Sequence, residues 1–245
     1  SQVRCNKVIE KDEAPTDSWR RRTGHRLNQR FGYVALGYFA DQDDIDLSPT
    51  QFGLPLAPGD VKYLDYNKDG VVDEHDEVAI GYANVPEINY GFGAQLTWKG
   101  LDLGVFFRGQ ANVTYYLGGA WFPFYGGVKQ GNLFEKALDR WSPENPNPNA
   151  YYPRLTEYRN TNNQKTSTKT IYDGSLIRLS DVEAGYTFRG DWLSNWGCQA
   201  FRVYFVGSNL WMHSPWDMCD PETGSSDGSR YPLTRKFNFG VRFTF

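Results

Sequence analysis

The residues with the clearest potential for chemistry are the evenly spaced oxygen-bearing side chains of the acidic segment 65–76. The segment reads Asp65-Tyr66-Asn67-Lys68-Asp69-Gly70-Val71-Val72-Asp73-Glu74-His75-Asp76. It has the spacing of a calcium-binding loop, with side-chain oxygens at the first, third, fifth, ninth and twelfth positions, a backbone carbonyl at the seventh and glycine at the sixth. We therefore expect calcium as a cofactor, bound by Asp65, Asn67, Asp69, Val71, Asp73 and Asp76.

The same segment has a second interpretation without metal. Asn and Asp side chains accept hydrogen bonds from nearby backbone N–H groups and close tight turns on their own. The twelfth position is Asp76, whose reach is shorter than that of the usual Glu. Because no helical pattern flanks the segment, a bound calcium ion is expected to stabilise a loop and not to act as a sensor.

A dense aromatic run, Tyr115 to Tyr125, is the second candidate site. Aromatic rings stack on sugar rings, so the run is a candidate lining for a glycan path. The residues concerned are Tyr115, Tyr116, Trp121, Phe122 and Tyr125. The pattern favours the alternative, in which the run forms an aromatic girdle at a strand end or packs within its own loop.

Catalytic and nucleic-acid-binding signals are absent from the sequence. The three histidines are scattered, and no HExxH, GxSxG or phosphate-binding glycine loop occurs. The formal net charge is −3, and the longest basic run is Arg20-Arg21-Arg22. We therefore expect neither an enzyme nor a nucleic-acid partner.

The secondary structure that flanks the two candidate sites is expected to consist of strands. In the last nine residues, apolar side chains at positions 237, 239, 241, 243 and 245 alternate with Asn, Gly, Arg and Thr, a period typical of a strand with one apolar face. Tyr90 to Trp98 and Leu101 to Phe107 alternate in the same way around Lys99-Gly100, which predicts a hairpin. Further strands are predicted at about 174–188, with a bulge where the apolar phase shifts, at 200–211 and within 1–10.

The predicted strands are joined by connections of alternating length. Long stretches at about 11–87, 112–173 and 212–234 alternate with a two-residue turn and with 189–199. This alternation is typical of an outer-membrane barrel, whose periplasmic turns are short and whose outer loops are long. Phe31 to Phe39 is interpreted as structure inside a long loop, and 133–141 as a short helix. Cys198 and Cys219 fall at opposite ends of a strand, too far apart for a disulfide.

Composition agrees with this fold class. Apolar residues make up 40% of the 245 residues, the mean hydropathy is −0.62, and no apolar run is long enough for a transmembrane helix. The 25 glycines, 16 tyrosines, 16 phenylalanines and 8 tryptophans suit a membrane barrel, although they also suit a secreted sandwich. Five or six strands are fewer than the roughly eight that a barrel needs, so we expect the chain to be a piece of a larger barrel that lacks its signal peptide.

Nine segments, in this order and spacing, resemble the C-terminal part of the SusC/RagA family of TonB-dependent outer-membrane transporters of the Bacteroidetes. They are Arg22-Thr23-Gly24-His25, Gly32-Tyr33-Val34-Ala35, Gly37-Tyr38-Phe39, Pro58-Gly59-Asp60-Val61-Lys62-Tyr63, Tyr90-Gly91-Phe92, Arg140-Trp141-Ser142-Pro143-Glu144-Asn145-Pro146, Tyr152-Pro153-Arg154-Leu155, Ile177-Arg178-Leu179-Ser180-Asp181-Val182-Glu183-Ala184-Gly185-Tyr186 and Gly207-Ser208-Asn209-Leu210. The resemblance covers nearly the whole chain, residues 1–245.

The resemblance implies an all-β fold: the C-terminal strands of a transmembrane antiparallel β-barrel of about 22 strands with long extracellular loops. It also implies import of oligosaccharides, less often peptides, together with a SusD-like surface lipoprotein, driven by TonB–ExbB–ExbD through a plug outside this sequence. The outer-membrane location follows, with extracellular loops and a periplasmic C-terminus. The alternatives are a soluble calcium-bearing carbohydrate-binding module or glycosidase domain, and a purely structural outer-membrane protein.

Overall fold

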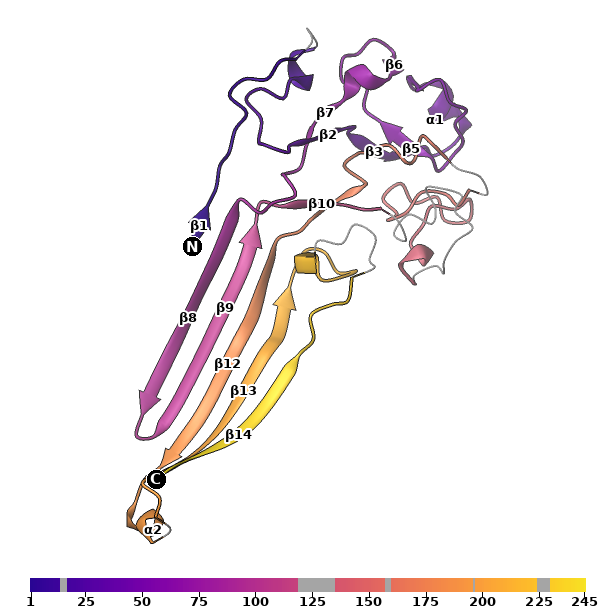
Figure 1. Cartoon of the computed structure of the whole chain (residues 1–245). Helices are drawn as coiled ribbons and strands as arrows, with labels where there is room; N and C mark the ends of the chain where they lie inside the picture. Colours follow the sequence, from indigo (N-terminus) through magenta and orange to yellow (C-terminus); the bar gives the residue numbers. More distant parts are fainter. Residues whose placement is uncertain (14–16, 119–134, 157–159, 196, 224–229) are drawn as a thin grey trace.

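A computed structural model describes residues 1–13, 17–118, 135–156, 160–195, 197–223 and 230–245. Its main element is a six-stranded antiparallel sheet in the order β1-β8-β9-β12-β13-β14 (Figure 1). The strands are β1 (Gln2–Val3), β8 (Ile88–Trp98), β9 (Leu101–Ala111), β12 (Leu176–Phe188), β13 (Ala200–His213) and β14 (Lys236–Thr244). All predicted strands are confirmed, and the predicted strand within 1–10 contributes only two residues.

The hairpin forms where the alternation predicted it. Lys99 and Gly100 both have positive φ, 45° and 92°, which suits the two-residue turns that match the twist of paired strands. Trp98 then pairs with Leu101, and the register continues to the pair Ile88 and Ala111. The sequence pattern and the backbone therefore agree along the whole hairpin.

The predicted bulge lies at Ser180. Leu179 pairs with Phe107 of β9, whereas Asp181 pairs with the adjacent residue Phe106, so one extra residue is inserted in β12. The insertion places Leu179 and Val182 on the same face of the sheet. In a regular strand, two residues three positions apart would lie on opposite faces. This geometry explains the phase shift of the apolar pattern.

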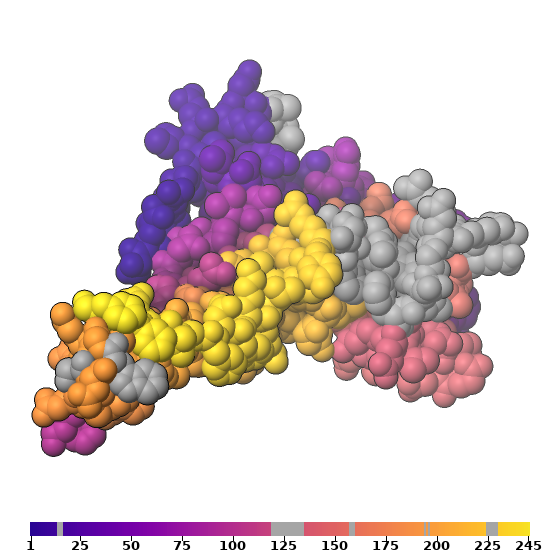
Figure 2. All heavy atoms as spheres, turned by 60° about the horizontal axis from the view of Figure 1, so that its bottom comes forward, coloured from indigo at the N-terminus to yellow at the C-terminus, as the bar shows by residue number. Residues whose placement is uncertain are grey.

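Short and long connections lie at opposite ends of the sheet, as predicted. The turn at Gly100, the connection 189–199 with the short helix α2 (Asp191–Ser194), and the C-terminus lie at one end, at the bottom of Figure 1. The long connections lie at the other end. In the part of the chain that is described, β1 and β14 form the two edges of the sheet, and β14 runs along the front of the space-filling view (Figure 2). The closure of a barrel and its strand number stay predictions.

The long connections carry most of the remaining secondary structure. Four small two-stranded sheets pair β2 (Arg30–Gly32) with β7 (Val78–Ile80), β3 (Ala35–Tyr38) with β5 (Val61–Tyr63), β4 (Thr50–Gln51) with β6 (Val71–Val72), and β10 (Thr114–Tyr116) with β11 (Ile171–Asp173). The helical segments are α1 (Gln42–Asp46) and the 3-10 turns Ser18–Arg20, Glu74–Asp76, Glu135–Leu138 and Pro221–Thr223. No helix among the described residues has the length and hydropathy needed to cross a membrane.

The buried core belongs to the long connections and not to the large sheet. It consists of Tyr33, Tyr38, Val61, Tyr63, Val72, Leu117, Ala137, Trp141, Ala150, Tyr152, Tyr172 and Trp216. The interpretation of 31–39 as loop structure is therefore confirmed, because β2 and β3 lie outside the large sheet and pair within this core. We call this region the loop core.

The helix predicted at 133–141 is too long. Residues 133 and 134 lie outside the described residues, and the helical turn covers only Glu135–Leu138. It ends early because the backbone N–H of Trp141 donates to Tyr152 O at 3.0 Å and that of Tyr152 donates to Asp139 O at 3.0 Å. Pairing with a distant segment therefore replaces the last helical turn.

Candidate functional site

The large sheet separates side chains into an apolar and a polar face. Cross-strand registers align the apolar residues in rows that run across β8, β9, β12, β13 and β14. One row is Leu96, Leu103, Ala184, Phe205 and Phe239, and the next is Trp98, Leu101, Tyr186, Val203 and Val241. Because side chains alternate along a strand, one continuous surface is apolar from edge to edge.

This apolar face is exposed. Phe239 is 82% exposed, Trp98 62%, Phe237 60% and Leu96 56%. Monomers in water rarely present continuous apolar surfaces of this extent, whereas the outer surface of a membrane barrel consists of them. The face therefore fits contact with lipid.

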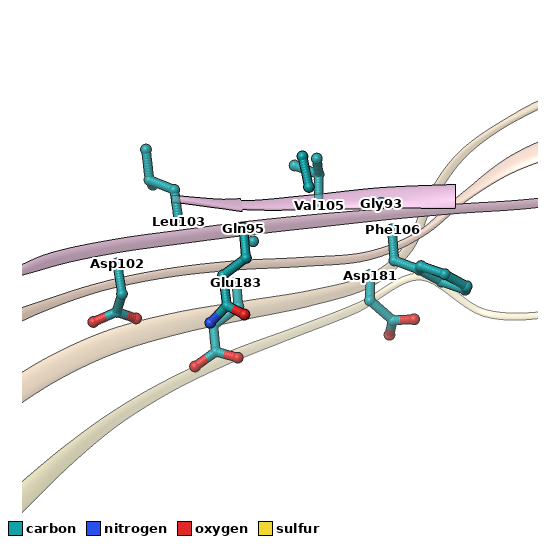
Figure 3. A pocket seen from close by; sticks show the side chains of 10 residues that line it. Gly93, Gln95, Asp102, Leu103, Val105, Phe106, Asp181 and Glu183 are labelled. Carbon is teal, nitrogen blue, oxygen red and sulfur yellow. The ribbon is translucent and has the colours of Figure 1, made fainter. Parts of the chain in front are cut away.

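The opposite face is polar and slightly hollowed. A cavity of about 510 Å³ lies over β8, β9 and β12, lined on its polar side by Gln95, Asp102, Asp181 and Glu183. Figure 3 shows these side chains pointing to one side of the strands, while Leu103 and Val105 point to the other. Farther along the same face, a second cavity of about 440 Å³ is lined by Arg108, Arg178 and Lys236 among others.

A three-residue ion-pair network lies beside the first cavity. Arg202 of β13 reaches across β12 to Asp102 of β9, with Nε donating to Oδ1 at 3.2 Å, and its Nη2 also donates to Glu183 Oε1 at 2.6 Å. Gly185 of β12 lies beneath the guanidinium. A Cβ atom there would stand 2.7 Å from both Arg202 Nη2 and Asp102 Oδ2, so only glycine leaves room for the bridge.

A second network holds the β13–β14 connection against the polar face. Arg178 of β12 is 2% exposed, and its Nη2 donates to both carboxylate oxygens of Asp220, at 2.6 and 2.7 Å. Its Nε lies 2.9 Å from Glu222 Oε2, and Arg108 Nη2 lies 2.9 Å from Glu222 Oε1. The only sign of either network in the sequence is the charged residues at the polar positions of the predicted strands.

The acidic segment forms a tight loop closed by its own carboxylates. Asp65 accepts from the N–H groups of Lys68 at 2.6 Å and Gly70 at 2.9 Å. Asp69 Oδ1 accepts from Val71 N at 2.9 Å, and this bond is the main cause of the lowered pKa of Asp69. Asp76, 1% exposed, accepts from Tyr66 N at 2.7 Å.

These contacts close the loop through its own side chains and do not decide between its two interpretations. Among the described residues, no group of three or more His, Cys, Asp or Glu side chains is placed to hold a metal ion. Calcium binding by Asp65, Asn67, Asp69, Val71, Asp73 and Asp76 stays a prediction. Within the same loop, His75 Nδ1 lies 2.9 Å from Asp17 Oδ2, and this hydrogen bond raises the pKa of His75.

The aromatic run is only partly described. Tyr115 and Tyr116 belong to β10 and are half-buried. The Tyr115 ring lies 5.6 Å from that of Tyr172, and the Arg30 guanidinium lies 5.2 Å from the Tyr116 ring. Trp121, Phe122 and Tyr125 lie outside the described residues. The role of the run in substrate binding therefore stays a prediction.

The loop core brings together three sequence segments that are far apart in the chain. Asp60 is fully buried and accepts from Arg154 Nε at 2.7 Å, Asn160 Nδ2 at 2.8 Å and Asn163 Nδ2 at 3.0 Å. Gly59 has φ of 87°, and a Cβ atom on it would stand 2.3 Å from the Trp141 ring. The segments 58–63, 140–146 and 152–155 thus form one packed unit.

The cysteines are separated along this architecture. Cys198 is buried near α2, and its N–H donates to Leu193 O at 3.1 Å. Cys219 lies beyond the other end of β13, where Trp216 Nε1 donates to its Sγ at 3.0 Å. Cys5, Cys198 and Cys219 are free thiols.

Two sequence relatives are known as receptors. TonB-dependent receptor P26 of Formosa agariphila is 32% identical over 228 residues, which cover 87% of this chain and 22% of the relative. TonB-dependent receptor P3 of the same organism is 27% identical over 255 residues, covering 96% of this chain and 24% of the relative. The chain thus spans less than a quarter of the length of these relatives. No protein-family model matches it.

Solved structures share the fold. The RagAB peptide transporter aligns with a TM-score of 0.69 and 21% identity over 92% of this chain and 23% of that chain. The open-open state of the RagAB peptide importer aligns with a TM-score of 0.65 and 18% identity over 95% of this chain and 24% of that chain. The sequence relatives identify the chain as a segment of a TonB-dependent receptor, and its fold is the one shared with the RagAB importer structures.

Proposed function

We propose that the chain forms part of the wall and outer loops of a TonB-dependent importer in the outer membrane. The observation that carries this proposal is the sheet with one exposed apolar face and one polar face, joined by short connections at one end and long ones at the other. In this arrangement the apolar face contacts lipid, the polar face lines the barrel interior, and the loop core lies outside the cell with the C-terminus in the periplasm.

The proposed partners follow from the same assignment. A SusD-like lipoprotein covers the extracellular side, and TonB–ExbB–ExbD acts through a plug that belongs to other parts of the receptor. The structural neighbours are RagAB complexes, which supports a partner protein in general. Because the relatives are named as receptors and transporters, they favour an importer over the alternative of a soluble calcium-bearing carbohydrate-binding or glycosidase domain.

Oligosaccharides are the proposed substrates. A second candidate is peptides, since the structural neighbours are named as a peptide importer. Their identity to this chain is 21% or less, so that likeness supports the shared fold and leaves the substrate open to test.

The importer assignment is tested with the full-length receptor in its source bacterium. We expect the receptor in the outer-membrane fraction, released only by detergent, and co-purified with a lipoprotein encoded beside it. Deleting the receptor gene should abolish growth on the oligosaccharide that induces it while growth on peptides continues. Recovery from the soluble fraction without detergent would refute the barrel, and loss of growth on peptides alone would favour the second candidate.

A further inference from the structure

A polar hollow of about 530 Å³ lies where the two longest connections meet. The residues used below are Arg22, Asn28, Gln29, Arg30, Asn84 and Thr166. They come from the turn before β2, from β2 itself, from the segment after β7 and from the turn that precedes β11. The volume lies within the range of about 300–1,000 Å³ found for small-molecule sites, and the lining is unusually polar for such sites.

Two guanidinium groups give the hollow a positive charge. The Arg22 guanidinium lies 5.0 Å from the centre of the Phe31 ring, and that of Arg30 lies 5.2 Å from the centre of the Tyr116 ring. Stacking on an aromatic ring fixes the plane of a guanidinium and leaves its N–H edge available for a planar anion. In the part of the chain that the structure describes, neither guanidinium forms an ion pair with a carboxylate.

A carboxylate that contacts this region binds two backbone N–H groups and a hydroxyl, and no guanidinium that the structure describes. Glu13 accepts from the N–H of Arg22 at 2.8 and 3.0 Å and from the N–H and hydroxyl of Thr23 at 2.9 and 3.0 Å. These bonds occupy the carboxylate oxygens. Among the described residues, the Arg22 side chain makes one hydrogen bond, a weak one from Nη1 to Gln29 O at 3.4 Å.

Gln29 joins two segments of the chain at the wall of the same hollow. The residue is 5% exposed, and its Nε2 donates to the carbonyls of Arg30, Ile80 and Gly81 at 3.0–3.1 Å. Those three bonds fix the amide orientation, yet Oε1 is buried without a hydrogen-bond partner among the described residues. Because Oε1 is buried below the surface of the hollow, the role of Gln29 is to position the wall: its amide ties the turn before β2 to the end of β7.

We propose that this hollow is a binding site for the acidic group of a saccharide, a carboxylate, sulfate or phosphate. Arg22 and Arg30 bind the anion through charge-assisted hydrogen bonds, and the amides of Asn28 and Asn84 supply further polar contacts to the sugar. The positive charge of the hollow, together with the oligosaccharide substrates proposed above, favours an acidic saccharide over an acidic peptide. The proposal rests on the importer function and narrows its substrates to acidic oligosaccharides.

The test is calorimetric titration of the purified full-length receptor in detergent. The probes are digalacturonic acid, its uncharged methyl ester, triglutamate and sodium sulfate. The variant Arg22→Gln/Arg30→Gln removes both charges, and Arg22→Lys/Arg30→Lys keeps them without the planar fork. Arg21→Gln is the matched control, because Arg21 is exposed, adjacent in sequence and not part of the hollow's lining.

We expect digalacturonic acid to bind at least about tenfold more tightly than its ester. The Gln double variant should lose about tenfold to hundredfold in affinity for the acid, with its affinity for the ester unchanged. The Lys double variant should lose less affinity for the acid, and Arg21→Gln should leave that affinity unchanged. Equal binding of acid and ester, or unchanged affinity in the Gln double variant, would overturn the proposal. Tighter binding of triglutamate would refute the saccharide class, and equally tight binding of sulfate would indicate a site for free anions.

The outcome is separable from that of the importer proposal. Titration needs neither TonB nor a membrane potential, so it reports on the hollow alone. A receptor that binds the acid selectively but does not import oligosaccharides would contradict only the importer function. A receptor that imports oligosaccharides but binds acid and ester equally would contradict only the anion site.

Discussion

Placing a charge at Ala94 is the most direct test of which face of the sheet contacts lipid. Ala94 is exposed on the apolar face, pairs with Val105 of β9, and follows Gly93, the central residue of the eleven-residue strand β8. At a rise of about 3.4 Å per residue and a tilt of about 40°, such a strand spans roughly 28 Å, close to the apolar band of about 25 Å in outer-membrane barrels. Ala94 should therefore lie within a few ångströms of the bilayer midplane.

The expected cost follows from this depth. An arginine at the midplane of a barrel's lipid face costs about 2–4 kcal/mol, which corresponds to roughly a 30-fold to 800-fold shift in the folding equilibrium. The neighbouring Gln95 offers the matched control, because its side chain lies on the opposite face at the cavity that Asp102 and Glu183 also line. Gln95→Arg should change stability by less than about 1 kcal/mol, since it meets solvent and carboxylates.

The assay is guanidinium-induced unfolding of the full-length receptor in lipid vesicles, followed by tryptophan fluorescence and by the migration of folded and unfolded forms on a gel. Ala94→Leu separates size from charge, and it should leave the midpoint of unfolding nearly unchanged. If Ala94→Arg and Gln95→Arg destabilise equally, or if Ala94→Arg has no effect, the assignment of the apolar face to lipid is wrong.

Three further predictions concern the loop core and its neighbours. Asp60→Ala removes the buried partner of Arg154 and should destabilise the loop core by about 3 kcal/mol. Amide hydrogen exchange should then become faster in the loop core and stay unchanged in the large sheet. An equal increase of the exchange rate in both regions would contradict this prediction. Chelation of calcium should speed proteolysis within 65–76, and unchanged cleavage rates would count against a metal there. The raised pKa of His75 means that its bond to Asp17 stabilises the fold fully below about pH 6.5, and that this stabilisation is lost as the pH rises through the pKa of the folded state. An NMR titration that places the pKa of His75 at or below its ordinary value would refute this prediction.

The strands were predictable because their side chains alternate between an apolar and a polar face of one sheet. Phe239 on the apolar face is 82% exposed, so its apolar character is not explained by burial within the chain. Alternation alone then specifies the faces, and one phase shift locates the bulge at Ser180. Turn chemistry at Lys99-Gly100 supplies the register of the hairpin.

The polar networks were not predictable because they join residues that are distant in sequence. Arg202 and Asp102 are 100 residues apart, and Asp60 and Arg154 are 94 apart. No local period signals such pairs. The helix predicted at 133–141 failed for the same reason, since the pairing of Trp141 with Tyr152 competes with the last helical turn. The hollow proposed as an anion site is lined by Arg22, Arg30 and Thr166, which the sequence leaves in separate segments.

The large sheet and the loop core are stabilised by different interactions, so a change of solvent should affect their stabilities differently. The large sheet has an apolar face that lipid or detergent must cover, so its stability depends on that medium. The loop core buries its own aromatic side chains and satisfies Asp60, Gln51 and Asn162 internally, with Gln51 Nε2 donating to Asn162 Oδ1 at 2.9 Å. A rigid core of this kind keeps the walls of the hollow around Arg22 and Arg30 in place, because β2 pairs with β7 independently of the large sheet. The proposed site would therefore be preorganised at the end of a sheet whose own stability depends on what covers its apolar face.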